Sequence, residues 1–114
     1  MTQAAFFVLA ALVDEPRHGY GILQEVDALS EGDVQLRVGT LYGVLDRLTA
    51  DGLIALDREE VHQGRLRRYY RILDAGEAAL SAEAARMASS ARTVSERLAA
   101  PRAPGRPGLA GGTA

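Results

Sequence analysis

The chain has 114 residues, a formal net charge of −2 at pH 7 and no cysteine. A chain of this length forms one domain with a modest core, near the size at which association helps stability, and the lack of cysteine excludes disulfides, thiolate metal sites and cysteine nucleophiles. The apolar run over residues 4–13 has no basic leader and is too short to span a bilayer, so we expect a soluble cytoplasmic protein without membrane contact.

Two helices are predicted before residue 30. Residues 3–13 are apolar on nearly every face, which indicates a helix buried between other elements. Residues 14–19 hold Pro16 and Gly19 and are predicted to form a loop. From Tyr20 onward, apolar side chains recur at helical spacing and predict a second helix. Its inward-facing residues are Ile22, Leu23, Val26 and Leu29.

A third helix follows a turn over residues 30–37. It is predicted to begin near Thr40, whose hydroxyl acts either as the N-cap or as a phosphate ligand. It is predicted to end at Asp51, because the following Gly52 suits the position after a helix. The residues of this helix predicted to be buried are Leu41, Val44, Leu45 and Leu48.

A β-hairpin and a last helix complete the predicted elements. Apolar and polar residues alternate after residue 53, and Gly64 lies near the hairpin tip. On the return strand, Arg68, Tyr70 and Ile72 share a face that we expect to point inward; the other face holds Arg67, Tyr69 and Arg71. Asp74 and Glu77 are predicted to open the last helix as a capping box, with Asp in place of Ser or Thr.

The order helix–helix–helix–hairpin–helix is typical of a winged helix-turn-helix, a mainly α fold with a small β-hairpin (class α+β). We expect the winged helix-turn-helix, DNA-binding domain to span residues 1–80 and a C-terminal dimerisation helix to span residues 74–98. The first helix is predicted to join the dimer interface. Residues 99–114 are rich in Pro and Gly and predict a disordered tail.

The charge is distributed unevenly along the chain. Residues 1–36 carry one Arg and six carboxylates, whereas residues 37–71 carry seven Arg and five carboxylates. Residues 61–71 hold four Arg and no acidic residue. The positive field is therefore local to the hairpin, which favours a polyanionic partner despite the negative net charge.

Six short motifs occur in the order and spacing of the PadR-like transcriptional regulators, which the chain resembles over residues 5–80. They are His18-Gly19-Tyr20, Gly39-Thr40-Leu41-Tyr42, Arg47-Leu48, Asp51-Gly52-Leu53, Arg68-Tyr69-Tyr70-Arg71 and Ala75-Gly76. The resemblance implies a dimeric DNA-binding regulator, usually a repressor, whose C-terminal helix builds the dimer. Many such relatives release DNA when a small molecule binds. A single short C-terminal helix is similar to the small subclass of the family.

Besides its single short C-terminal helix, the chain departs from this family pattern in two respects. Asp74 stands where relatives usually have Thr, although either residue can cap a helix. Tryptophan is absent, so the chain lacks the residue with which some small relatives sandwich an aromatic molecule.

The third helix is predicted to read DNA. When its leucines face inward, Thr40, Gly43 and Arg47 line the opposite side. Arg47 can bind guanine or a phosphate, and Thr40 can donate to a phosphate near the positive end of the helix dipole. Gly43 would let the backbone approach the floor of the groove.

Two of these assignments have alternatives. Tyr42 either contacts the DNA backbone or packs the helix against the wing. Arg47 either contacts DNA or pairs with Asp46 or Asp51. The full set of predicted DNA contacts is Tyr20, Arg37, Thr40, Tyr42, Gly43, Arg47, Arg65 and Arg67.

The two wing arginines in that set, Arg65 and Arg67, are expected to reach phosphates or the minor groove independently of sequence. The alternative is a solvated charged edge that blunts strand pairing. Arg68 is predicted to pair with Asp57 or Glu59.

Two positions of the winged domain are assigned structural roles. Tyr70 is expected to belong to the core, and His18 is expected to be a structural hydrogen-bonding residue. We expect no metal site at the two histidines, because His62 lies on the wing and His18 in a distant loop.

The last helix carries an apolar stripe of coiled-coil type, whose members alternate at spacings of four and three residues. With the first helix, it predicts a two-fold homodimer that binds a pseudo-palindromic operator with half-sites about one helical turn apart. The alternative is that the stripe packs on its own domain. The predicted interface comprises Phe6, Phe7, Leu80, Ala84, Met87, Ala91, Val94 and Leu98.

The sequence argues against an enzyme. It has no glycine-rich phosphate loop and no histidine beside a candidate serine nucleophile, so we expect neither catalysis nor a cofactor. A cleft beside Phe7, Met87 or Val94 could admit a small apolar or aromatic effector. The alternative to a sequence-specific DNA-binding regulator is a winged-helix module that binds a protein or a small ligand without DNA recognition.

Overall fold

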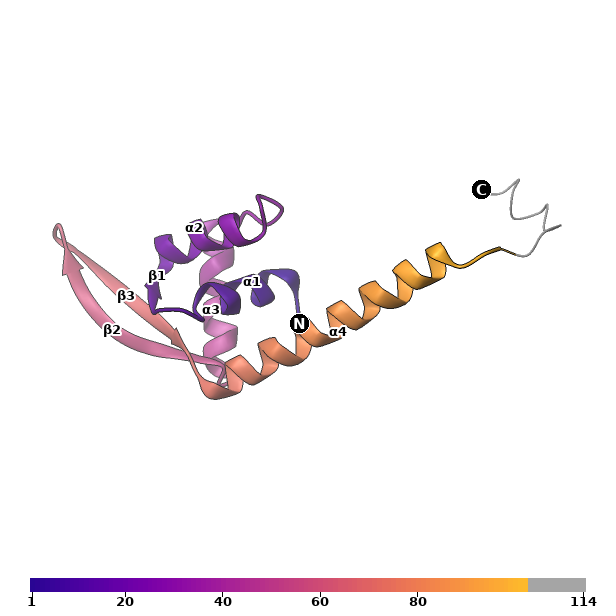
Figure 1. Cartoon of the computed structure of the whole chain (residues 1–114). Helices are drawn as coiled ribbons and strands as arrows, with labels where there is room; N and C mark the ends of the chain where they lie inside the picture. The colour runs from indigo at the N-terminus through magenta and orange to yellow at the C-terminus, as the bar shows by residue number, and fades with distance from the viewer. Residues whose placement is uncertain (103–114) are drawn as a thin grey trace.

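A computed structural model describes residues 1–102, so the predicted C-terminal tail lies outside the described residues from residue 103 onward. Four helices and a three-stranded antiparallel sheet make up this part of the chain (Figure 1). They are α1 (Gln3–Ala11), β1 (Arg17–His18), α2 (Gly19–Leu29), α3 (Val38–Ala50), β2 (Ile54–His62), β3 (Arg65–Ile72) and α4 (Asp74–Ala99). The predicted α+β class and the winged helix-turn-helix order are confirmed.

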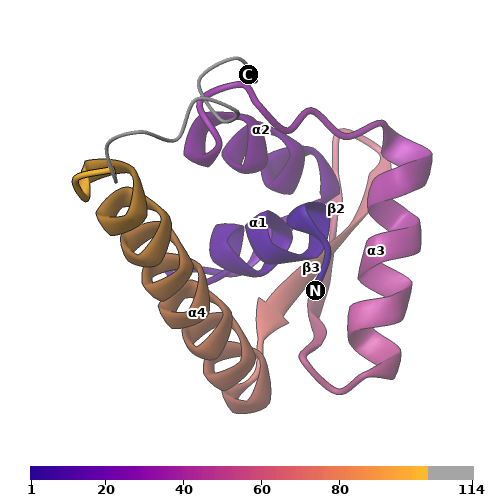
Figure 2. The ribbon, with the colours of Figure 1, turned by 90° about the vertical axis from the view of Figure 1, so that its right-hand side faces the viewer.

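The core lies where α1 meets α2, α3 and the base of the sheet, and α1 also contacts the beginning of α4 (Figure 2). Each fully buried aliphatic side chain contributes about 1.5–3 kcal/mol of transfer free energy. The largest fully buried side chains are Leu9, Leu12, Ile22, Leu41, Leu45, Ile54, Val8 and Val26. No helix within residues 1–102 combines the length and apolarity that crossing a membrane requires.

The predicted inward faces of α2 and α3 are largely confirmed. Leu41, Leu45 and Leu48 are buried, and Val44 is half-buried against the same core. The prediction for Leu29 is wrong, because its side chain is 45% exposed. Leu29 is the last residue of α2 and extends past the elements that cover Ile22.

The segment predicted to be a loop before α2 contains a short strand. In β1, Arg17 pairs with Tyr70 and His18 pairs with Tyr69, so β1 becomes an edge of the sheet in the order β1-β3-β2. A strand of two residues has no periodic pattern of its own. It exists because β3 supplies the hydrogen-bonding partner.

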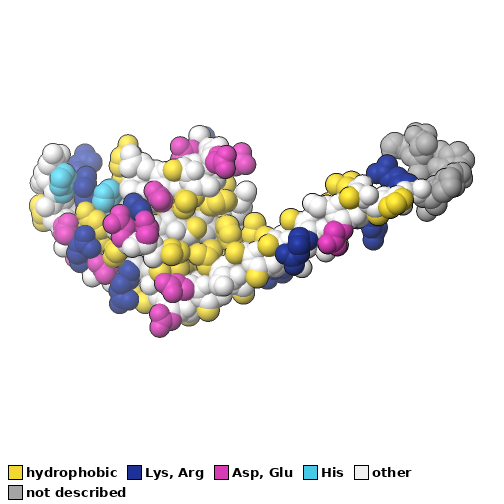
Figure 3. Space-filling view, in the orientation of Figure 1, with side chains coloured by type: hydrophobic (Ala, Val, Ile, Leu, Met, Phe, Trp, Pro, Cys, Tyr) yellow, Lys and Arg dark blue, Asp and Glu magenta, His cyan; other side chains and the backbone are white. Residues whose placement is uncertain are grey.

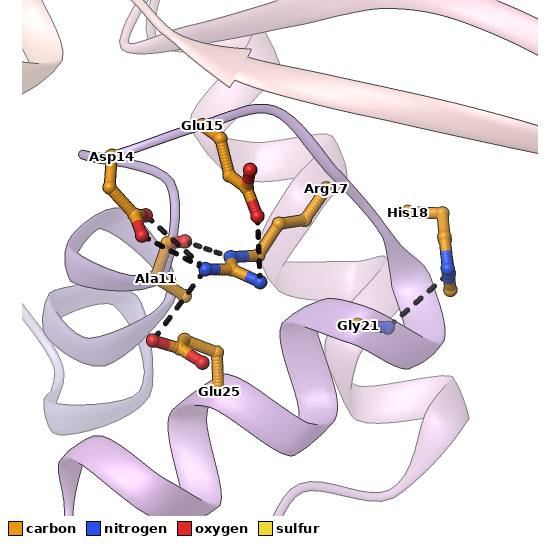
Figure 4. Close-up of polar contacts among 7 residues, drawn as sticks. All are labelled: Ala11, Asp14, Glu15, Arg17, His18, Gly21 and Glu25. Atoms are coloured by element: carbon orange, nitrogen blue, oxygen red, sulfur yellow. Dashed lines mark hydrogen bonds and ion pairs between the residues drawn. The ribbon is translucent and has the colours of Figure 1, made fainter.

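The side chain of Arg17 fastens this strand to the helices on either side (Figure 4). Its Nε donates to the carbonyl oxygen of Ala11 at 2.8 Å, which satisfies a free acceptor at the end of α1. Its Nη2 lies 3.1 Å from an Asp14 carboxylate oxygen and 3.7 Å from one of Glu25. Its Nη1 lies 3.4 Å from Glu15. Since the Arg17 side chain is only 19% exposed, these contacts join α1, β1 and α2 in a partly desolvated position.

The β2–β3 hairpin extends beyond the helices as a wing. Gln63 and Gly64 form its two-residue turn with φ values of 51° and 78°, the left-handed conformation that a type I′ turn requires. Near the base, an irregularity between Leu56 and Arg58 adds one residue to β2.

The expectation that Arg68 faces inward is wrong, because its side chain is 60% exposed. Arg68 lies on the same face of β3 as Tyr70, as predicted. At this position, however, the hairpin extends beyond the core, so the Arg68 side chain is not covered. Tyr70, one step nearer the base, is half-buried and packs against the core.

Two helices begin earlier than predicted. The N-cap of α3 is Arg37, which makes no side-chain capping bond, so Thr40 lies in the first turn and is not the cap. The N-cap of α4 is Leu73, so the capping box at Asp74 does not form. The Leu73 N–H donates to the Leu53 carbonyl oxygen at 2.9 Å, which keeps Leu73 extended and starts the helix at the next residue. Asp74 and Glu77 instead occupy the first turn, where carboxylates favour the helix dipole.

The first turn of α4 packs directly on the chain that enters the wing. Gly76 is buried, and a Cβ atom at this position would lie 2.2 Å from the Leu53 carbonyl oxygen and 2.8 Å from Cγ1 of Ile72. Only glycine permits this approach, since the closest obstacle is backbone. Gly76 therefore sets the place at which α4 leaves the domain.

We expect Gly76→Ala to lower the free energy of unfolding by about 2 kcal/mol or more, because the added methyl group must displace backbone. Gly43→Ala is the matched control: its Cβ would meet nothing within 4 Å, so a glycine in a helix interior is replaced without a clash. The control should gain up to about 1 kcal/mol. Denaturant unfolding of both variants measures the difference. Equal stabilities would contradict the described packing.

Candidate nucleic-acid interface

The outer face of α3 presents three of the predicted contact residues. Thr40, Gly43 and Arg47 are all exposed, on the side opposite the buried leucines. Gly43 has open space around its Cα, so the backbone itself is accessible there. Arg37, at the N-cap of α3, is exposed beside main-chain N–H groups that no side chain caps. The face is thus small, polar and positively charged.

A groove of about 660 Å³ lies beside this face and brings three elements together. The beginning of α2, one side chain of α3 and the outer part of β3 form its walls. Its lining residues are His18, Gly19, Tyr20, Tyr42, Arg65, Leu66, Arg67 and Arg68. Four of the predicted DNA contacts, which are far apart in the sequence, therefore border one groove.

Tyr42 connects the helices with the wing. Its hydroxyl oxygen would lie 2.8 Å from a Cβ at Gly19, so the ring lies against the beginning of α2. It remains 45% exposed and faces the groove with Arg65 and Arg67. Tyr20 is 65% exposed on the same rim. Both tyrosines are accessible to a molecule in the groove.

The arginines of the wing fall into two groups. Arg58, Arg68 and Arg71 are neutralised: Arg58 Nε lies 2.6 Å from Glu60, Arg68 Nε lies 2.9 Å from Glu59, and Arg71 Nε lies 3.7 Å from Asp57. The predicted pairing of Arg68 with Glu59 is confirmed. Dark blue side chains gather over the hairpin together with their acidic partners (Figure 3).

In the part of the chain that the structure describes, the second group of wing arginines, Arg65 and Arg67, has no such partner, and neither do Arg37 and Arg47 of α3. Within residues 1–102, no ion pair involves Arg37, Arg47, Arg65 or Arg67, so the alternative pairing of Arg47 with Asp46 or Asp51 is not formed. Exposed ion pairs contribute only about 0–1 kcal/mol to stability, yet they cancel charge locally. Within residues 1–82, the uncompensated positive charge is therefore concentrated on α3 and the wing. The other described arginines without an ion pair are Arg92, Arg97 and Arg102, in the last part of α4 and just after it.

His18 has the structural role that the sequence predicts. It is the N-cap of α2, and its Nδ1 accepts a hydrogen bond from the Gly21 N–H at 3.3 Å. Its ring lies edge-on to Tyr69 at 5.2 Å between centroids. Burial lowers the pKa of His18, and the charges of Arg67 and His62 lower this pKa further. The loop bearing His18 is consequently close to the wing, contrary to the expected separation.

Tyr70 has its pKa raised by burial, with a further contribution from neighbouring Tyr42. Among residues 1–102, no three His, Asp or Glu side chains are grouped as metal ligands.

Sequence reasoning missed the role of Arg17 and the neutralisation of Arg58 and Arg71. The isolated position of Arg17, as the single Arg among six carboxylates before residue 37, was the available signal.

The residues predicted for the dimer interface lie on two elements. Phe6 and Phe7 are half-buried on α1, with ring centroids 5.3 Å apart. Leu80 packs against its own core, so the alternative reading of the stripe holds for this residue. Every residue from 84 to 99 is exposed while α4 extends away from the domain (Figure 1). The exposed stripe members are Ala84, Met87, Ala91, Val94 and Leu98.

A winged helix-turn-helix with an uncompensated basic face is the architecture of a DNA-binding regulator. Residues 8–82 match the transcriptional regulator PadR-like family. The chain belongs to this family. It is thus a transcriptional regulator of a class without enzymatic activity.

Similar proteins come from several bacteria. The transcriptional regulator Rv3488 of Mycobacterium tuberculosis is 39% identical over 87 residues, which cover 76% of this chain and 78% of that protein. A PadR family transcription regulator from Clostridium difficile has a TM-score of 0.72 at 19% identity, covering 85% of this chain and 99% of the other. Bacillus subtilis PadR in complex with operator DNA has a TM-score of 0.60 at 20% identity, covering 68% of this chain and 44% of that one.

We expect the stability of the protein to fall as the pH is lowered from about 7.5 to about 5.5. The pKa of His18 in the folded chain lies below its ordinary value of 6.5, so the folded state disfavours protonation. The stabilisation that the folded state gains from a neutral His18 is complete when the pH is above that ordinary value. This stabilisation is lost as the pH falls through the pKa of the folded state. Protonation also removes the acceptor that caps α2.

The variant His18→Asn distinguishes the pH dependence caused by His18 from the pH dependence caused by the carboxylates. Asparagine caps a helix without titrating, so the variant should lose less stability over the same interval. Urea unfolding at a series of pH values measures both proteins. Identical pH profiles for the parent and the variant would contradict the role of His18.

Proposed function

We propose that this protein is a homodimeric, sequence-specific DNA-binding repressor, in which α3 enters the major groove and the wing holds the flanking backbone. The observation that carries the proposal is the coincidence of three properties on one surface: an exposed helix face of small and polar residues, a groove bordered by a wing, and arginines without ion-pair partners. A major groove admits a helix of this kind.

Within this proposal, Arg47 reads base edges. It lies in the last turn of α3 on the exposed face, and its guanidinium can donate two hydrogen bonds to guanine O6 and N7. Thr40 and Gly43, on the same side, allow the backbone of α3 to approach the base pairs closely. These contacts supply sequence preference.

The phosphate contacts are assigned to the periphery. Arg37 lies beside the uncapped N–H groups at the beginning of α3, where the helix dipole favours an anion. Arg65, Arg67, Tyr20 and Tyr42 border the groove between the helices and the wing. Such contacts set the register on the duplex without distinguishing sequence.

The dimer is supported by the free half of α4. Every residue from 84 to 99 is exposed within the single chain, and a helical segment of about 16 residues without a packed face is marginal in water. Pairing the stripe on α4 with that of a second copy, together with α1, would bury Met87, Val94 and Leu98. A two-fold pair then requires a pseudo-palindromic operator. Bacillus subtilis PadR, which has a similar fold, forms a complex with operator DNA, and this supports the DNA-binding part of the proposal.

Release by a small apolar or aromatic effector is the regulatory part of the proposal. Phe7 is half-buried on α1, while Met87 and Val94 are exposed on α4. An effector held between these helices in a dimer would change the angle between the two subunits. The distance between the two α3 helices depends on that angle, so operator affinity would change with it.

Arg47→Ala and Arg67→Ala test the division between base reading and backbone contact. Arg47→Ala should reduce operator binding more strongly than random-sequence binding, by about 1–3 kcal/mol of discrimination. Arg67→Ala should weaken both by the same factor and reduce the dependence of log Kd on log salt. Fluorescence anisotropy with both duplexes measures these effects.

Arg71→Ala is the control, since this arginine is already paired with Asp57. It should bind nearly as the parent does. If Arg47→Ala and Arg67→Ala behave alike on the two duplexes, the assigned roles are wrong. If the parent shows no affinity for any genomic duplex at low salt, the proposed function itself fails.

The double variant Met87→Asp with Val94→Asp tests the dimer. The parent should have about twice the chain mass of 12.1 kDa by light scattering at micromolar concentration. The variant should be monomeric, because charges would be buried at the paired stripe. Its helical circular dichroism should fall as the free half of α4 frays.

Ser89→Asp is the matched control, because Ser89 is exposed on α4 but lies off the stripe. It should leave the dimer intact. A double variant that stays dimeric with full helicity would place the interface elsewhere.

A further inference from the structure

The outer part of the wing carries an apolar pair that the proposed phosphate contacts do not use. Val61 and Leu66 are direct cross-strand partners of β2 and β3, one step from the turn pair His62 and Arg65. They are 75% and 58% exposed. Paired residues in antiparallel strands point to the same face of the ribbon. Leu66 also borders the groove, whereas Val61 lies beside Leu66 on β2 and is not part of the groove lining.

The surroundings of this pair favour one kind of occupant. Arg65 and Arg67 flank Leu66 along the groove and have no ion-pair partner within residues 1–102, whereas Arg68 is neutralised by Glu59. Tyr20 and Tyr42 form the opposite wall. Successive side chains of a strand point to opposite faces, so Arg65 and Arg67 lie on one side of β3 and Leu66 on the other. The stretch of β3 that borders the groove therefore alternates along its length between positive and apolar side chains.

The backbone of a nucleic acid alternates in the same way. Phosphates are anionic, whereas the deoxyribose rings between them present C–H groups. A purely anionic ligand would use the arginines and leave Leu66 in water. A purely apolar ligand would leave the arginine charges without a partner. One strand of duplex DNA satisfies both.

We propose that Val61 and Leu66 pack against deoxyribose faces of the strand whose phosphates Arg65 and Arg67 hold. This inference rests on the proposed function and adds a second component to it. The arginine contacts release counterions and weaken with salt. The apolar contact removes water from surface without neutralising charge, so it is independent of salt.

Cross-strand pairs also stabilise hairpins, by roughly 0.2–1 kcal/mol, so the test must keep the wing intact. Leu66→Thr and Val61→Thr remove apolar surface and place at each position a β-branched threonine, which strands accommodate well. Leu56→Thr is the matched control: Leu56 is 46% exposed on β2 but pairs with Tyr70 near the base of the wing, away from Leu66. Urea unfolding of each variant verifies that the fold is retained.

The measurement is affinity for a random-sequence duplex over a series of salt concentrations. Leu66→Thr should weaken binding by about fivefold at every salt concentration, with the slope of log affinity against log salt unchanged. Val61→Thr should act in the same direction. Arg67→Ala should instead lower the slope by about one per subunit. Leu56→Thr should match the parent.

Two results would overturn the inference while leaving the proposed function in place. In the first, both Thr variants bind a duplex as tightly as the parent does, while Arg67→Ala binds the same duplex more weakly than the parent. The other is a reduced salt slope for Leu66→Thr, which would mean that the arginines are displaced and no separate contact is lost. A parent without affinity for any duplex would overturn both proposals, so the two failures are distinguishable.

Discussion

Burial of one face of α3 is the constraint on which the rest of the structure depends. Leu41, Leu45 and Leu48 fill the core between α1 and the base of the sheet, and each is at most 3% exposed. A helix held this firmly by one face has no freedom to rotate. Positions 40, 43 and 47 must therefore face outward, whatever side chains they carry. The exposed face of α3, which we propose contacts DNA, is a consequence of its packing.

The wing extends this surface without a core of its own. It is held at its base by pairing with β1, by the contacts of Arg17 with Ala11 and Glu25, and by the approach of Gly76 to the Leu53 carbonyl oxygen. Beyond Tyr69, no third strand within residues 1–102 pairs with the ribbon, and its surface combines charged side chains with the apolar pair Val61 and Leu66. Ion pairs neutralise the arginines nearest to carboxylates, and those that remain border the groove.

Periodicity predicted the helices and the hairpin correctly, because apolar spacing reports directly which face is buried. It could not predict β1, since the partner strand of Arg17 lies more than 50 residues later in the chain. It also misplaced two helix starts, where Leu73 and Arg37 cap through backbone geometry alone. The residues predicted to contact DNA from α3 are exposed, as the apolar spacing of that helix implies, but the groove that unites Tyr20, Tyr42 and the wing is a tertiary feature.

The central claim is that two α3 helices of a two-fold dimer enter successive major grooves of one duplex. Hydroxyl-radical footprinting on a duplex selected from the genome of origin tests this claim most directly. The account predicts two protected windows of equal strength, with centres about one helical turn apart and related by a two-fold axis. A single protected window, or windows without that symmetry, would contradict it.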